Sequence, residues 1–157
     1  MSFLRKVLYE GDSNFNGKVR VEDMFGVRKL IASDFTQSRS LNSQGNSEVY
    51  WDAFITLAGE QSKNASILIL GLAAGTGASM LRKKFPDATI DGVEIDQVIV
   101  DLGKKYFGLG KSRINIIVTD AKDYVATTKK TYDLVYLDVF IGGVAPSFAS
   151  EDSHFEE

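Results

Sequence analysis

A glycine-rich segment at residues 71–77 carries the clearest chemical signal in this 157-residue chain. Small residues at Gly71, Ala73 and Gly75 let the backbone pass close beneath a bound molecule, because no bulky side chain intervenes. The segment follows a short apolar run and opens a helical pattern, whose first amides have no acceptor within the helix. It predicts a strand–loop–helix unit that binds a ligand. The alternative is a tight turn that merely needs glycine.

An acidic residue ends the next apolar run. Glu94 lies 23 residues after Gly71, a position from which a carboxylate can accept both hydroxyls of a ribose. The glycines are spaced G-x-x-x-G-x-G instead of the dinucleotide pattern G-x-G-x-x-G, and no feature typical of pyrophosphate binding accompanies them. These residues favour a nucleoside without phosphates over NAD. The alternative for Glu94 is an ordinary surface charge at a strand end.

Two further acids follow the next two apolar runs, Asp120 after the first and Asp138 after the second. In open α/β sheets, ligands bind outside the carboxyl ends of the strands. The glycine segment, Glu94, Asp120 and Asp138 are therefore expected to face one crevice.

The elements that position these residues alternate between strand and helix. Strands are predicted at 67–70, 88–93, 114–118 and 132–137, and helices at 76–85, 97–107 and 122–127. This order is typical of βαβ units and a parallel sheet. The run 67–70 is wholly apolar, as expected for a strand buried on both faces.

The N-terminal part has a different pattern. Residues 18–22 alternate between apolar and charged, a turn follows at 23–26, and residues 27–32 form a second strand. A loop is expected at 11–17, with a possible third strand at 6–10. The polar stretch 37–47 is expected to be a loop and a subdomain boundary, and a helix follows near 48–59. We predict a β-rich cap and loop at 1–47 and an α/β domain at 48–157.

The composition excludes several kinds of site. A net charge of −3 with no basic face gives no reason to expect nucleic acid. The absence of cysteine rules out disulfides and thiolate metal sites, and no metal site is predicted. No apolar run reaches the ~18–20 residues of a membrane span, and residues 1–8 are charged too early for a signal peptide. We expect a cytoplasmic protein whose lone histidine, His154, is solvated.

Four segments together resemble the class I S-adenosylmethionine-dependent methyltransferase fold, and within it the spermidine synthase-like branch. They are residues 67–77, 92–107, 118–121 and 132–138. The N-terminal hairpin, Gln37 and Tyr50 resemble the β-cap of spermidine synthases. The resemblance implies a Rossmann-like, doubly wound sheet of seven strands, of which the chain contains the first four, so the domain looks incomplete at its C-terminus. It also implies a possible homodimer.

The resemblance further implies roles for individual residues. Cofactor-binding residues would be Gln37, Gly71, Ala73, Gly75, Glu94, Ile95, Asp120 and Ala121. Among them, Glu94 would hold the ribose hydroxyls, Ile95 would pack on adenine, and Asp120 would accept from the exocyclic amine. Asp138 would be the catalytic acid that takes a proton from the attacking amine, because an ammonium cannot attack a sulfonium until it loses a proton.

Two departures from the family pattern decide between reactions. Ala74 stands where polyamine synthases have an acid that binds the aminopropyl amine, and residues 138–143 lack the second acid that holds a diamine. Both favour a methyltransferase that uses S-adenosylmethionine on an amine or similar nucleophile of a small molecule or a protein. The alternatives are a polyamine (spermidine/spermine) aminopropyltransferase, whose donor would be decarboxylated S-adenosylmethionine, and a non-catalytic nucleoside-binding or dimerisation protein. Tyr50 and Trp51 are either an acceptor-pocket wall or core.

Overall fold

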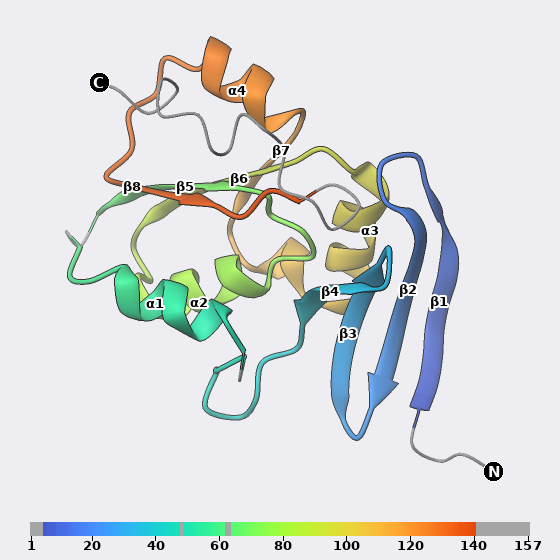
Figure 1. Cartoon of the computed structure of the whole chain (residues 1–157). Helices are drawn as coiled ribbons and strands as arrows, with labels where there is room; N and C mark the ends of the chain where they lie inside the picture. The colour runs from blue at the N-terminus through green and yellow to red at the C-terminus, as the bar shows by residue number, and fades with distance from the viewer. Residues whose placement is uncertain (1–4, 48, 62–63, 141–157) are drawn as a thin grey trace.

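The computed structural model describes residues 5–47, 49–61 and 64–140. The first part of the chain forms an antiparallel sheet in the order β1-β2-β3-β4 (Figure 1). Its strands are β1 (Arg5–Ser13), β2 (Gly17–Met24), β3 (Val27–Ala32) and β4 (Phe35–Arg39). On β2 and β3, Val19, Val21, Leu30 and Ala32 are fully buried. They pack against Ile99 and Leu102 of α3 (Gln97–Tyr106), so the cap rests on this helix.

Two predictions for the cap are wrong. The segment 11–17 is not all loop, because β1 continues to Ser13 and only residues 14–16 turn. The polar stretch from Gln37 is not all loop either, because β4 runs to Arg39 and pairs with β3, Leu30 opposite Ser38. The sequence of β4 shows no alternation of apolar and polar residues. It is a strand because it pairs with β3. The cap therefore has four strands instead of a hairpin with a possible third.

The second sheet is parallel, as predicted, and runs in the order β7-β6-β5-β8. Its strands are β5 (Ser66–Leu70), β6 (Thr89–Glu94), β7 (Asn115–Val118) and β8 (Leu134–Leu137). Their ends differ from the predicted ones by a residue or two, the usual uncertainty of boundaries. From β5 the chain adds β6 and β7 on one side and then β8 on the other, so the strand order reverses between β5 and β8. Ligands bind at such a switch point in open α/β sheets.

Helices cover both faces of the parallel sheet (Figure 1). On one face, Ile67 and Ile69 pack with α2 (Thr76–Lys84) and with Phe54 of α1 (Trp51–Leu57). On the other, Leu68 and Leu70 pack with α4 (Ala121–Thr127). Burial on both faces explains the wholly apolar run of β5. A short 3₁₀ helix, η1 (Leu109–Lys111), follows α3.

The predicted fold class is confirmed: a Rossmann-like α/β sheet with an N-terminal antiparallel cap. The boundary at residues 47 and 48 stays a prediction. No helix in the described ranges is long and apolar enough to cross a bilayer. His154 and the rest of 141–157 lie outside the described residues.

Candidate functional site

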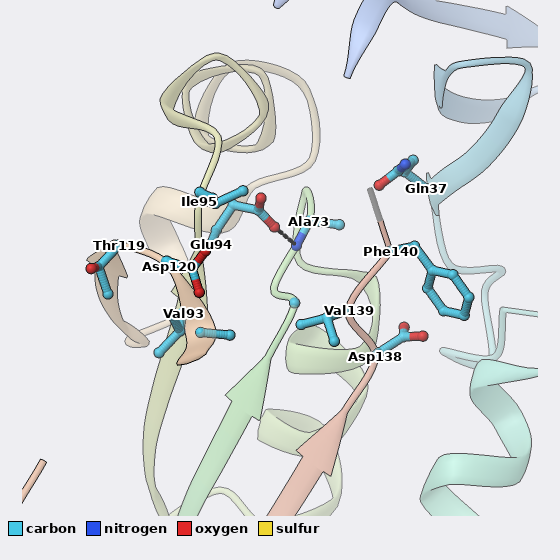
Figure 2. Close-up of a pocket in the computed structure, with 12 residues that line it drawn as sticks. Gln37, Ala73, Val93, Glu94, Ile95, Thr119, Asp120, Asp138, Val139 and Phe140 are labelled. Carbon is cyan, nitrogen blue, oxygen red and sulfur yellow. Dashed lines mark hydrogen bonds between the residues drawn. The ribbon is translucent and has the colours of Figure 1, made fainter. Parts of the chain in front are cut away.

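A pocket opens at the carboxyl edge of the parallel sheet, where the strand order reverses (Figure 2). Every strand of that sheet contributes residues at or just after its carboxyl end, and β4 of the cap contributes one more. The lining residues are Gln37, Gly71, Ala73, Val93, Glu94, Ile95, Thr119, Asp120, Ala121, Asp138, Val139 and Phe140. Apart from Gly75, the structure brings all the predicted site residues together here.

Gly75 lies elsewhere, at the residue preceding α2. Its φ of 91° is in the left-handed region, which favours glycine. A Cβ at this position would lie 2.6 Å from the Leu109 side chain. Gly75 thus serves the turn into α2 and the close approach of η1.

Glu94, the last residue of β6, is buried, with 9% of its surface exposed. One oxygen accepts from the Ala73 N–H at 2.8 Å and the other from the Asp96 N–H at 3.1 Å. Burial raises the pKa of Glu94, and these backbone bonds act against that rise. Each carboxylate oxygen can accept more than one hydrogen bond, so Glu94 retains acceptor capacity toward the pocket.

The amides of the glycine loop are already committed to acceptors within the protein. The N–H groups of Gly71 and Leu72 donate to the carbonyl of Val93, and that of Gly75 donates to Leu72. Those of Ala73 and Ala74 donate to side chains, Glu94 and Ser38 respectively. All five amides from 71 to 75 therefore have partners, unlike the free amides of an anion-binding loop.

Three other predicted residues line the pocket from different elements. Asp120 precedes α4 and accepts from the Lys122 N–H at 2.7 Å, so it caps that helix. Ala121 is the first residue of the same helix and is buried. Gln37 reaches in from β4, and its amide donates to Asn16 at 3.4 Å.

Asp138 follows β8 and is positioned by two aromatic side chains. The Tyr50 hydroxyl and the Trp51 indole N–H both donate to its Oδ2, each at 3.2 Å. Burial raises the pKa of Asp138, although these two hydrogen bonds lower it in part. In Figure 2, Glu94 and Asp138 lie on either side of Val139. Glu94 can accept hydrogen bonds from hydroxyl groups on one side, and Asp138 can accept a proton on the other.

The sequence did not indicate that Trp51 would contact Asp138, 87 residues away. Trp51 is buried and Tyr50 half exposed, so this aromatic pair is both core and site wall. Nor did the sequence reveal that Asp96, the N-cap of α3, also accepts from Ser13, the last residue of β1, and from Asn16 in the turn after it. The aromatic pair at the start of a helix was the available signal for the contact between Trp51 and Asp138. No signal in the sequence indicated the contact of Asp96 with Ser13 and Asn16.

Comparisons with known proteins show which family this sequence resembles. Residues 49–157 match the model of the spermine/spermidine synthase domain. A probable polyamine aminopropyl transferase of Bifidobacterium longum is 30% identical over 135 residues, which cover 84% of this chain and 30% of that protein. The human eEF1A lysine and N-terminal methyltransferase is 30% identical over 81 residues, 47% of this chain and 12% of that protein.

Among solved structures, a probable spermidine synthase from Corynebacterium glutamicum superposes with a TM-score of 0.75 at 22% identity. The match covers 96% of this chain and 57% of that one, and it supports the fold. The chain thus spans roughly a third to somewhat over half of these polyamine-synthase relatives. With the family model matching well over half of its length, the chain belongs to the spermine/spermidine synthase domain family, a family of transferases.

Proposed function

We propose that this chain binds decarboxylated S-adenosylmethionine and transfers its aminopropyl group to an amine. The observation that carries the proposal is the charge of the pocket. Its lining includes three carboxylates, Glu94, Asp120 and Asp138, and no lysine, arginine or histidine among the described residues. The relatives named polyamine aminopropyltransferases favour the same reaction over the methyl transfer expected from the sequence.

The two donors differ in one group, a carboxylate that S-adenosylmethionine has and its decarboxylated form lacks. Among the described lining residues no basic side chain can pair with that carboxylate, and the amides of residues 71–75 already have acceptors. Placing an anion beside three carboxylates without a donor is unfavourable. A donor that carries only positive charges suits the pocket better.

The residues present fit such a donor. Glu94 has acceptor capacity left for ribose hydroxyls, and Asp120 and Ile95 line the neighbouring part of the pocket. When bound, the donor supplies a sulfonium whose adjacent carbon is open to attack by a nucleophile. The chain's part is to hold that carbon and the amine in line, which accounts for much of the acceleration in such reactions.

Asp138 supplies the base in this proposal. An amine is mostly protonated at neutral pH, so a proton must leave before its lone pair can attack. Both described hydrogen bonds to Asp138 arrive on Oδ2, and Oδ1 is the oxygen assigned to the amine. The raised pKa of Asp138 makes it a better proton acceptor than an ordinary carboxylate.

Calorimetric titration tests the donor. We expect heat with decarboxylated S-adenosylmethionine and with methylthioadenosine, and affinity for S-adenosylmethionine lower by about tenfold or more. An anion left without a partner costs at least as much as an unpaired neutral polar group, for which the cost is roughly 1–3 kcal/mol. Equal or tighter binding of S-adenosylmethionine would reject aminopropyl transfer. No heat with any of the three would reject the nucleoside site itself.

The base is tested with Asp138→Asn. We expect turnover to fall by about 100- to 10,000-fold, the usual worth of a general base, while methylthioadenosine still binds. Asp101→Asn, on the exposed face of α3, is the matched control and should leave both unchanged. Full activity of Asp138→Asn would exclude the assigned role.

Methyl transfer remains the second candidate because of Ala74. This residue stands where polyamine synthases have an acid for the aminopropyl amine, and here it is buried against the cap and α3. If the titration favours S-adenosylmethionine, methyl transfer to the same amine becomes the better assignment.

A further inference from the structure

A second pocket adjoins the first and shares Gln37, Ala73, Asp138 and Phe140 with it. Its remaining lining comes from β4, from α1 and the residue that precedes it, and from the end of β8: Phe35, Thr36, Tyr50, Phe54 and Leu137. It encloses about 520 Å³, within the range of small-molecule sites. Because the two pockets meet at Asp138, a molecule here would present its reactive end to the proposed base.

This second pocket has aromatic walls that are partly open to solvent. Phe35 is 56% exposed, and Tyr50 and Phe140 are each 49% exposed. Single exposed apolar side chains are ordinary, but three around one opening mark a binding surface. Tyr50 and Phe54 are also in edge-to-face contact, with ring centroids 5.7 Å apart, so part of the wall is already packed.

The charge of the second pocket is limited to one end. Asp138 is the only ionisable carboxylate or base among its described lining residues, and its other polar side chains are Thr36, Gln37 and the Tyr50 hydroxyl. Tyr50 already donates to Asp138, and burial raises the pKa of Tyr50, so this phenol stays neutral. One ammonium can therefore pair with Asp138, whereas a second one further along would lie among aromatic rings.

A cation can also interact with aromatic faces, and such contacts are favourable. Burying a full charge without a hydrogen-bonding or charged partner costs more free energy than such a contact returns. An apolar tail instead gains free energy with each methylene that it buries. The balance favours a tail without a second charge.

From this geometry we propose that the acceptor is a monoamine: a primary amine with one ammonium and an apolar aliphatic or aromatic tail. The inference rests on the proposed function of the adjoining donor pocket. The ammonium first gives a proton to Asp138. The amine lone pair then forms a C–N bond to the carbon next to the sulfonium, the C–S bond breaks, and its electron pair returns to sulfur as a neutral thioether. The proton on Asp138 passes to water.

The test compares two acceptors of equal length, hexylamine and 1,6-diaminohexane, which differ only at the far end. Turnover with decarboxylated S-adenosylmethionine is measured together with calorimetric binding of each amine in the presence of methylthioadenosine. We expect kcat/KM and affinity to favour hexylamine by about 10- to 100-fold. A diamine that binds and reacts equally well or better would overturn the inference.

A variant sharpens this comparison. Phe35→Glu places a carboxylate at the exposed rim of the second pocket and should shift the preference toward the diamine by about tenfold or more. Phe25→Glu is the matched control, since Phe25 is 73% exposed in the β2–β3 turn and lines neither pocket. An unchanged preference in Phe35→Glu would count against this pocket as the acceptor site.

The two proposals fail in different ways. If neither decarboxylated S-adenosylmethionine nor methylthioadenosine binds, the proposed function fails and the acceptor inference fails with it. If the donor binds and is consumed but the diamine is preferred, only the monoamine inference fails. Donor binding is measured first, so the outcomes are distinguishable.

Discussion

At the scale of single residues, the reactivity of Asp138 depends on its burial and on two neighbours. Burial raises its pKa, while Trp51 and Tyr50 stabilise the ionised form by donating hydrogen bonds. The carboxylate accepts a proton only when it is ionised, so turnover in the proposed reaction should fall as pH drops through this raised pKa. The acid limb of the pH profile should accordingly lie above the range of an ordinary aspartate.

Tyr50→Phe tests that dependence, because it removes a hydroxyl and leaves the ring. With one stabilising bond lost, the pKa of Asp138 rises further, and the acid limb of kcat/KM should move to higher pH. Tyr106→Phe is the control, since the Tyr106 hydroxyl donates to Leu8 in the cap instead. An acid limb that stays in place in Tyr50→Phe would contradict the coupling between Tyr50 and Asp138.

Gly71 is the second residue whose type is dictated by its surroundings. Its φ is 89°, and a Cβ would lie 2.2 Å from the carbonyl oxygen of Asp138. Gly71→Ala should therefore lower the free energy of unfolding through both backbone strain and a clash with backbone. Gly17→Ala separates the two, because Gly17 has a φ of 61° and open space around it.

We expect Gly17→Ala to cost about 1–2 kcal/mol, the strain of the left-handed region alone, and Gly71→Ala to cost more. Urea unfolding of both variants measures the difference. Equal losses would show that β8 can shift away from residue 71 at little cost.

At the scale of elements, Asp96 joins the cap to the parallel sheet. It caps α3 by accepting from the Val98 N–H at 2.9 Å, and it also accepts from Ser13 at the end of β1 and from Asn16 in the following turn. Both of these partners are buried, so neither can turn to water if Asp96 is removed. This contact complements the apolar packing between β2, β3 and α3.

Asp96→Ala should destabilise the fold by about 2–4 kcal/mol. About 1 kcal/mol of this is the lost N-cap of α3, and about 1–3 kcal/mol is the cost of leaving its buried partners unsatisfied. Asp120→Ala is the comparison, because Asp120 caps α4 without such buried partners, and it should cost about 1 kcal/mol. Thermal unfolding of both variants provides the measurement. Similar losses would mean that the hydrogen bonds between Asp96 and the N-terminal sheet add no stability.

Some strands can be predicted from the sequence and others cannot, for physical reasons. β5 is readable because burial on both faces requires an apolar run. β4 is not readable, since its polar residues form a strand only by pairing with β3. At the site, strand-end acids such as Glu94 follow from topology, whereas the bonds from Trp51 to Asp138 and from Ser13 to Asp96 depend on how distant segments pack.

At the scale of the whole molecule, the opposite end of the parallel sheet contains a polar network that the proposed reaction does not use. Asp91 of β6 is 1% exposed. It accepts from Lys130 and Tyr132 at 2.7 Å and from Asn115 at 2.9 Å. The network thus ties β6 to β7 and to the segment that leads into β8, which ends at Asp138. The integrity of this network affects how β8 is held against the sheet.

The network also gives stability a defined dependence on pH. Burial alone would raise the pKa of Asp91, but the hydrogen bonds from Lys130, Tyr132 and Asn115 outweigh it and hold the pKa below its ordinary value of 3.8. A carboxyl whose pKa is lower in the folded state stabilises the fold above its unfolded pKa. That contribution is lost as pH falls through the folded pKa.

Asp91→Asn should therefore lower the free energy of unfolding at neutral pH by about 1.5–3 kcal/mol, the worth of hydrogen bonds to a charged group. The difference from the native chain should shrink once the pH falls below about 4, because the native carboxyl is then protonated in both states. Asp123→Asn, exposed on α4, controls for the change in net charge. Urea unfolding across this pH range measures both variants, and a difference that stayed constant down to low pH would mean that the charge of Asp91 does not stabilise the sheet.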